Sequence, residues 1–107
     1  MPEPKGLKDV RLADKVFGAL AHPARRQILL SVCYRGTCNA GEIARRFECS
    51  WPTTSRHLST LVESGLLEVQ KAGRERVYSA NTELVKGVLA KWAGYFEVGP
   101  GGRKKQR

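Results

Sequence analysis

Residues 50–65, SWPTTSRHLSTLVESG, are the stretch that most constrains how this chain can fold. Ser50 is a favourable helix N-cap, and Pro52 is tolerated in a first helical turn, where its missing N–H costs little. Gly65 readily adopts the left-handed conformation that ends a helix. The helical period of about 100° per residue gives this segment an apolar side, made of Thr54, Leu58, Leu61 and Val62. The stretch therefore predicts a short amphipathic helix with defined ends.

The opposite side of this helix is polar and comprises Pro52, Thr53, Arg56, Ser59, Thr60 and Glu63. Most of these side chains are small, and the only carboxylate stands at the far end. A helix side that merely faces solvent usually carries several Lys and Glu residues, whereas this helix has one Glu and no Lys. The composition favours contact with the edges of base pairs, and a simple solvated face is the alternative.

The net charge of the chain indicates a polyanionic partner. Its 107 residues include 19 Lys and Arg but only 10 Asp and Glu, which gives +9 and a pI near 10.0. The basic residues 98–107 predict a disordered tail that binds phosphate without specificity, and residues 1–8, with two prolines and a glycine, predict a flexible arm. Residues 9–97 remain for a single folded domain.

The chain has no run of about 18 apolar residues, and its N-terminus lacks the apolar stretch of a signal peptide. We therefore expect a cytoplasmic protein without a membrane partner. Cys33, Cys38 and Cys49 fit neither a disulfide framework nor a CxxC metal site, so that reduced and mostly buried thiols are expected.

Three helices are predicted before residue 50. The first begins at Asp9 and carries apolar residues three and four apart, and the second runs from Pro23 to about Tyr34 and ends at Gly36. The second should direct Ile28, Leu29, Val32 and Cys33 inward. Asn39, followed three residues later by Glu42, predicts a capped third helix. Only Glu48 and Cys49 separate this helix from Ser50, which predicts a helix-turn-helix.

After Gly65 the apolar period changes to two, as Leu67 and Val69 illustrate, and Gly73 is suited to a tight turn. This pattern predicts a two-stranded β-hairpin whose exposed cations are Lys71, Arg74 and Arg76. A last helix, capped by Asn81 or Thr82, carries an apolar stripe too broad for one small core. Part of the stripe is expected to contact a second copy of the chain. The predicted dimer interface comprises Val16, Phe17, Val85, Val88, Leu89, Trp92 and Phe96.

The predicted order of four helices, a basic hairpin and a last helix is that of a winged helix-turn-helix, a mostly α fold with a small β-hairpin. From Phe17 to Asn81 the sequence also resembles the ArsR family of small dimeric bacterial repressors. The resemblance is carried by His22–Arg26, Ser55–Leu58, and Gly65–Leu66 followed by Gly73–Arg74. It implies that the helix from Ser50 lies in the major groove, that the hairpin contacts the flanking backbone, and that the first and last helices form the dimer.

Residue by residue, the resemblance makes Trp51, Thr53, Ser55 and Arg56 candidates for contacts with base edges. Arg56 is the strongest candidate, since a guanidinium can bind guanine through two hydrogen bonds. Ser59 and His57 are expected either to contact phosphate or to pack against the rest of the protein. For His57 the sequence favours neither role over the other. Trp51 has an alternative role, closing the turn against the third helix.

The sequence departs from the family at its usual metal-binding positions. Asn39 and Gly41 replace the cysteine pair, and residues 82–97 contain no His or Cys. We therefore expect no metal and no other cofactor. A thiol switch remains open as an alternative to structural cysteines, and Glu48 replaces a common glycine between the third and fourth helices.

No arrangement of nucleophile, base and orienting group points to an enzyme. The sequence thus predicts a homodimeric repressor that binds an inverted repeat in double-stranded DNA, with an unknown effector. A protein-interaction module and a nonspecific architectural DNA-binding protein are the alternatives.

Overall fold

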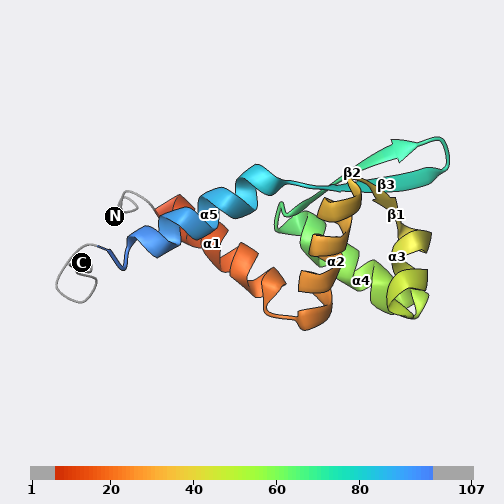
Figure 1. The fold of residues 1–107 in the computed structure, drawn as a ribbon, viewed down its shortest axis with the longest axis horizontal. Helices are drawn as coiled ribbons and strands as arrows, with labels where there is room; N and C mark the ends of the chain where they lie inside the picture. Colours follow the sequence, from red (N-terminus) through yellow and green to blue (C-terminus); the bar gives the residue numbers. More distant parts are fainter. Residues whose placement is uncertain (1–6, 98–107) are drawn as a thin grey trace.

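The computed structural model describes residues 7–97 (Figure 1). Within this range the chain forms five helices and one antiparallel sheet of three strands. The elements are α1 (Leu7–Leu20), α2 (Pro23–Arg35), β1 (Cys38–Asn39), α3 (Ala40–Phe47), α4 (Trp51–Glu63), β2 (Leu67–Ala72), β3 (Glu75–Ala80) and α5 (Thr82–Gly94). The fold is the predicted winged helix-turn-helix. Helix α1 begins two residues before the expected Asp9, because Leu7 and Lys8 are themselves good helix formers.

Side chains at the N-termini of the helices satisfy backbone N–H groups that have no partner inside the helix. Asn39 and Glu42 form the predicted capping box, with both hydrogen bonds at 2.8 Å. Ser50 caps α4 and Asn81 caps α5, as expected. The cap of α2 was not predicted: the Nδ1 atom of His22 accepts a hydrogen bond from the Ala24 N–H at 3.2 Å.

The turn between α3 and α4 is as short as the sequence predicts. Glu48 adopts a left-handed conformation with φ 53°, and it is the one non-glycine residue with positive φ in residues 7–97. Gly36 and Gly65 have φ values of 91° and 88°, which confirms them as the residues that end α2 and α4. Left-handed backbone costs little at glycine but strains a glutamate, so the compact turn persists because α3 and α4 pack together.

Strands β2 and β3 form the predicted hairpin, with Leu67 opposite Ala80 and Lys71 opposite Arg76. Gly73, with φ 67°, begins the two-residue loop that joins them. The sequence analysis did not anticipate a third strand: the short β1 adds to the free edge of β3 and pairs Cys38 with Tyr78. Such a pairing joins residues 40 positions apart, and no local pattern encodes it.

The core lies where α1, α2, α4 and the hairpin meet. Its largest fully buried side chains are Ile28, Leu61, Leu66, Leu67, Val16, Val32 and Thr54. Cys33 was expected to face this core, but it is exposed. The buried arc of α2 is formed by Ile28, Leu29 and Val32, and the next residue in the helix lies beyond its edge.

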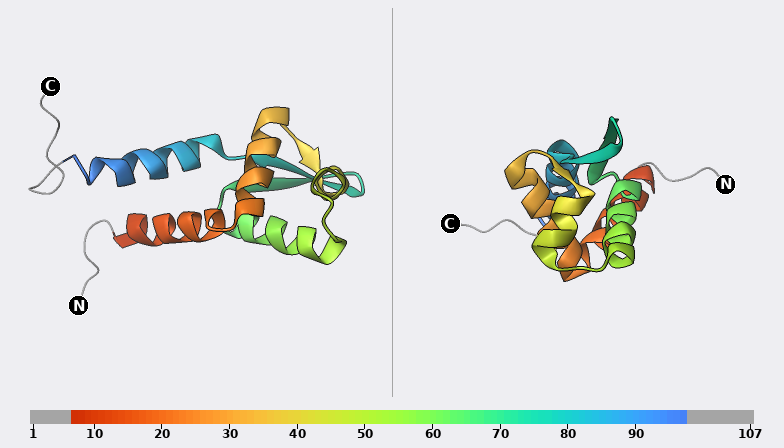
Figure 2. Two further views of the ribbon diagram at one scale, coloured as in Figure 1. Left: turned by 60° about the horizontal axis from the view of Figure 1, so that its bottom comes forward. Right: turned by 90° about the vertical axis from the view of Figure 1, so that its right-hand side faces the viewer.

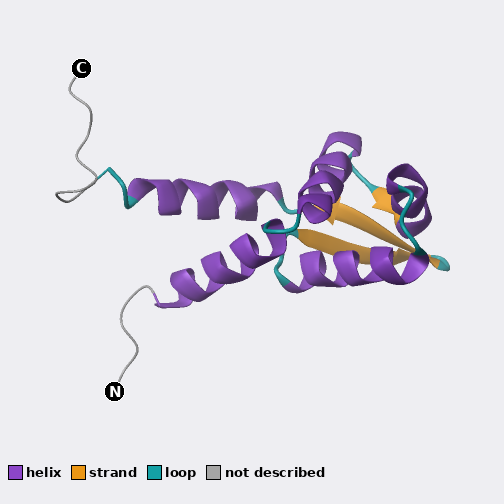
Figure 3. Cartoon of the chain, turned by 90° about the horizontal axis from the view of Figure 1, so that it is seen from below, coloured by secondary structure: helices purple, strands orange, loops and turns teal. Residues whose placement is uncertain are grey.

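Helices α1 and α5 project together from the rest of the molecule (Figures 2 and 3). We call this pair the α1–α5 arm, and the part formed by α2, α3, α4 and the sheet the body. The rings of Phe17 and Trp92 meet edge to face across the arm at 5.1 Å, and Trp92 stacks similarly on Phe96 at 4.8 Å. The arm therefore leaves much of its surface outside the core of its own chain.

Candidate nucleic-acid interface

Helix α4 presents a polar side to solvent, as its sequence predicts. Ser55, Arg56 and Ser59 are exposed on this side, and Trp51 is 59% exposed at its N-terminus. Thr54, Leu58 and Leu61 are buried on the other side. The side predicted to contact DNA is therefore free of contacts with the core.

Thr53 lies at the edge of this polar side and belongs to the helix cap. Its N–H donates to the Ser50 hydroxyl at 3.3 Å, and the same hydroxyl donates to Thr53 Oγ1 at 2.9 Å. The side chain is half-buried. Thr53 thus has a structural partner that Ser55, Arg56 and Ser59 do not have in the described chain.

His57 was grouped with the candidate DNA contacts, but it lies on the packed side of α4 and is only 8% exposed. Its ring contacts that of His22 edge to face, with 4.6 Å between centroids. Burial lowers the pKa of His57 below the ordinary 6.5, and the neighbouring His22, Arg25 and Arg56 lower it further. This position favours the packing role that the sequence left open.

A groove of about 540 Å³ separates the N-terminal part of α4 from the hairpin. Its lining residues come from α3, α4 and the sheet: Asn39, Ala40, Gly41, Arg45, Trp51, Ser55, Leu58, Arg74, Glu75, Arg76 and Tyr78. Three guanidinium groups line it against a single carboxylate. Trp51 and Ser55, predicted to contact bases, thus share a groove with Arg74 and Arg76, predicted to contact the backbone.

Arg45 is a lining residue that the sequence analysis did not identify. It stands on α3, and its proximity to the hairpin depends on how α3 and the sheet pack. In the sequence it is one of two adjacent arginines, Arg45 and Arg46, on the helix preceding α4, and no local pattern distinguishes it from its neighbour.

The hairpin carries its cations close together. Lys71 and Arg76 are paired directly across the two strands, and Arg74 stands in the loop. Like charges opposite one another destabilise a β-ladder. An anion bound between them would relieve this repulsion.

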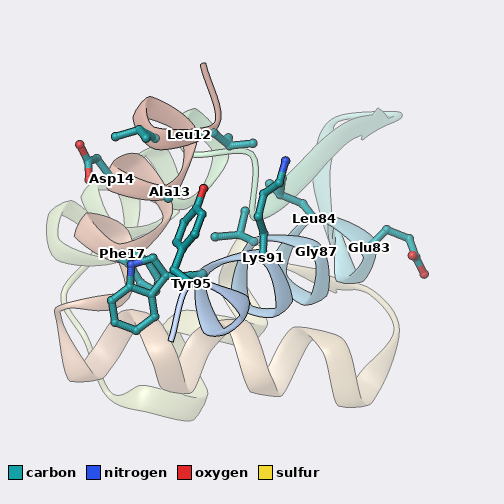
Figure 4. Close-up of a pocket in the computed structure, with 12 residues that line it drawn as sticks. Leu12, Ala13, Asp14, Phe17, Glu83, Leu84, Gly87, Lys91 and Tyr95 are labelled. Carbon is teal, nitrogen blue, oxygen red and sulfur yellow. The ribbon is translucent and has the colours of Figure 1, made fainter. Parts of the chain in front are cut away.

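The α1–α5 arm has an apolar surface with a pocket of about 410 Å³ between its helices (Figure 4). Leu89, Trp92 and Phe96, which belong to the predicted dimer interface, are about half exposed, and Val10 and Tyr95 add two further exposed apolar side chains. Val16 was predicted at the interface but is fully buried within its own chain, and Val88 is 9% exposed. Val16 therefore has no exposed surface to offer a second copy, and Val88 has little, although it lines the pocket.

The cysteines differ in their environments. Burial raises the pKa of Cys38 above its ordinary 9.0, although the nearby Arg35 acts in the opposite direction. Cys49 is partly buried, and its thiol donates to the Phe47 carbonyl at 3.6 Å. With Cys33 exposed, the expectation of mostly buried thiols holds fully only for Cys38.

Neither a metal cluster nor a membrane span is found in residues 7–97. No three His, Cys, Asp or Glu side chains of this range converge on one point. Its helices are too short or too polar to cross a bilayer.

Comparison with known proteins matches this fold to transcriptional regulators. A family model described as a helix-turn-helix domain matches residues 20–70. The chain is 34% identical over 73 residues to the transcriptional repressor SdpR of Bacillus subtilis (strain 168), an alignment that covers 68% of this chain and 80% of that protein.

Solved structures agree with the sequence comparison. The crystal structure of an ArsR family transcriptional regulator is 31% identical, with a TM-score of 0.72 over 80% of this chain and 93% of the other. The homodimeric winged helix-turn-helix DNA-binding domain Mb0332 of Mycobacterium bovis has a TM-score of 0.72 over 99% and 98% of the two chains. Its identity is 20%, so that it supports the fold alone. On its sequence and its fold together, this chain belongs to the ArsR family of winged helix-turn-helix transcriptional regulators.

Proposed function

We propose that this protein is a homodimeric repressor that binds a short inverted repeat in double-stranded DNA inside the bacterial cell. In this proposal α4 enters the major groove, and Ser55 and Arg56 contact base edges. Repression follows when the bound dimer covers a promoter. The name of the related repressor from Bacillus subtilis supports the proposal by analogy.

The observation that carries the proposal is the shared groove of α4 and the hairpin. One wall presents Trp51 and Ser55 from α4, and the other presents Arg74 and Arg76 from the hairpin. A DNA strand that lies in this groove would have its phosphates near the guanidinium groups while the adjacent base edges face α4. A solvated helix with no ligand does not explain why cations from α3 and the hairpin converge beside α4.

Dimerisation would occur through the arm. Leu89, Trp92, Tyr95 and Phe96 expose apolar area that a second copy could bury. A two-fold axis along this surface would present two copies of α4 to the same side of a duplex, about 34 Å apart, as in other helix-turn-helix dimers. The proposal therefore predicts half-sites with centres roughly ten base pairs apart.

Selection from random duplex DNA tests this function directly. We expect the full-length protein to enrich an inverted repeat with that spacing, and its affinity to fall steeply as salt increases. Loose binding of every duplex without enrichment would instead identify a nonspecific architectural protein. If no DNA sequence is enriched and no duplex binds at low salt, the proposal fails and the protein-interaction module is favoured instead.

A further inference from the structure

The corner between α1 and α2, residues 18–26, connects the arm to α4. Arg25 donates from Nε to the Ala19 carbonyl at 2.7 Å and from Nη2 to the Gly18 carbonyl at 3.1 Å. Arg26 donates from Nη1 to the Leu20 carbonyl at 2.7 Å. These carbonyls belong to the last turn of α1, whose carbonyls lie beyond the regular hydrogen bonds of the helix. The Gly18 carbonyl also accepts from the Ala21 N–H at 3.3 Å.

The two arginines occupy an unfavourable position in their own helix. They stand in the first turns of α2, whose N-terminus carries a partial positive charge and contains no acidic side chain in its first turn. The same cations are favourable at the C-terminus of α1, where the partial charge is negative. Their placement thus stabilises the angle between α1 and α2 at some cost to α2 alone.

His22 extends this connection to α4. Its Nδ1 atom is held by the Ala24 N–H, and its ring packs on the ring of His57 in the middle of α4. The contact lies behind the polar side of α4, because Arg56, next in sequence to His57, is exposed on the front. The arm, the corner and the back of α4 therefore form one continuous set of contacts.

The other helix of the arm meets the end of α4. The Asn81 N–H donates to the Leu66 carbonyl at 2.9 Å, just before α5 begins. Gly65 lies so close to α5 that an added Cβ would be 2.9 Å from Leu84 Cδ2. Helix α4 is thus held relative to the arm at two places, its middle and its C-terminal end.

From these contacts we infer that Arg25, Arg26 and His22 are positioning residues that set the orientation of α4 on the dimer, and thereby its preference for one half-site spacing. The inference rests on the proposed function, since spacing has a meaning only for a dimer on an inverted repeat. The three residues act through the arm, which would carry the two-fold axis, and through His57.

The experiment compares two operators, the selected inverted repeat and the same repeat with one base pair inserted at its centre. The insertion moves the half-sites by about 3.4 Å and rotates them by about 34°. The quantity measured is the ratio of the two dissociation constants, which we expect to be about tenfold or more for the unchanged protein. A ratio taken on one sample does not depend on the fraction of active protein.

Arg26→Ala removes one hydrogen bond from an exposed side chain, so that folding should persist, as a thermal unfolding curve can verify. We expect this variant, and more strongly Arg25→Ala/Arg26→Ala, to reduce the ratio at least threefold, because a loosened corner lets α4 adapt to the longer operator. Arg26→Lys retains one donor for the Leu20 carbonyl and should restore most of the ratio. Arg35→Ala is the matched control, since it removes an α2 guanidinium that pairs with Glu42 away from the corner.

Three results overturn the inference, and they are distinguishable. If the selection yields no inverted repeat, the proposed function fails, and the inference fails with it. If it yields one and the unchanged protein binds both operators equally, the function stands and the inference about spacing fails. If the unchanged protein discriminates and Arg26→Ala weakens both operators by the same factor, the function stands and the corner merely stabilises the fold.

Discussion

Arg56 is the cation of α4 that stands on its exposed side, and its predicted role is contact with a base edge. We expect Arg56→Ala to cost about 1–3 kcal/mol on the selected operator and to relax the preference at one position. Arg56→Lys should retain affinity for random duplex but lose part of the preference, because an ammonium cannot form the two parallel hydrogen bonds of a guanidinium. Competition binding with operator variants measures both effects. An equal loss on operator and scrambled DNA would show that Arg56 contacts only the backbone.

The burial of His57 should make the stability of the folded protein depend on pH. Its pKa is lowered in the folded protein, chiefly by burial, whereas the unfolded chain binds a proton with the ordinary pKa of 6.5. Below about pH 6.5 the unfolded state therefore takes up more protons, and the free energy of unfolding should fall as the solution is acidified. Above this pH His57 is neutral in both the folded and the unfolded chain, and it no longer makes the free energy of unfolding depend on pH.

Urea denaturation at several values between pH 7.5 and 5 measures this dependence. His57→Phe keeps an aromatic ring against His22 but removes the titrating group, so that its free energy of unfolding should decline less over the same range. Parallel curves for the two proteins would mean that other groups cause the loss.

At the scale of elements, the hairpin is expected to supply affinity without sequence preference. Replacing Lys71, Arg74 and Arg76 together by glutamine should weaken the operator and random duplex by similar factors. Each lost phosphate contact should reduce the slope of log affinity against log salt by about 0.9. Gln70→Ala, which changes a neutral exposed residue of β2, is the control. A loss confined to the operator would assign the hairpin a role in base recognition.

The elements themselves follow largely from local patterns. The caps at Asn39 and Ser50 and the turn at Gly73 each depend on residues within a few positions. They were therefore predictable. Strand β1 was not, because its two residues become a strand only by pairing with Tyr78 and Val77.

At the scale of the whole molecule, the exposed apolar surface of the arm predicts self-association. Leu89→Ser/Phe96→Ser removes two side chains that are about half exposed in the protomer. In a symmetric dimer each substitution acts twice, once in each protomer. We therefore expect the free energy of dimerisation to weaken by about 3 kcal/mol, which raises the dimer dissociation constant roughly a hundredfold. Sedimentation equilibrium and operator binding should both report the change.

Leu30→Ser is the matched control for this prediction. Leu30 is 65% exposed on α2, outside the arm, and its replacement should leave the dimer intact. If Leu30→Ser dissociates the dimer, or if Leu89→Ser/Phe96→Ser does not, the dimer interface lies outside the arm.

The sequence alone determined the ends of α3 and α4, the short turn between them, the hairpin and the polar side of α4, because spacing, capping and turn chemistry act over short distances along the chain. Only the tertiary structure decided that His57 packs on His22, that Val16 belongs to the core and not to an outer surface, and that Arg45 lines the groove beside the hairpin. The helical period predicts which residues share one side of a helix. The neighbour that each side meets depends on contacts between residues far apart in the chain, and only the packed molecule specifies those.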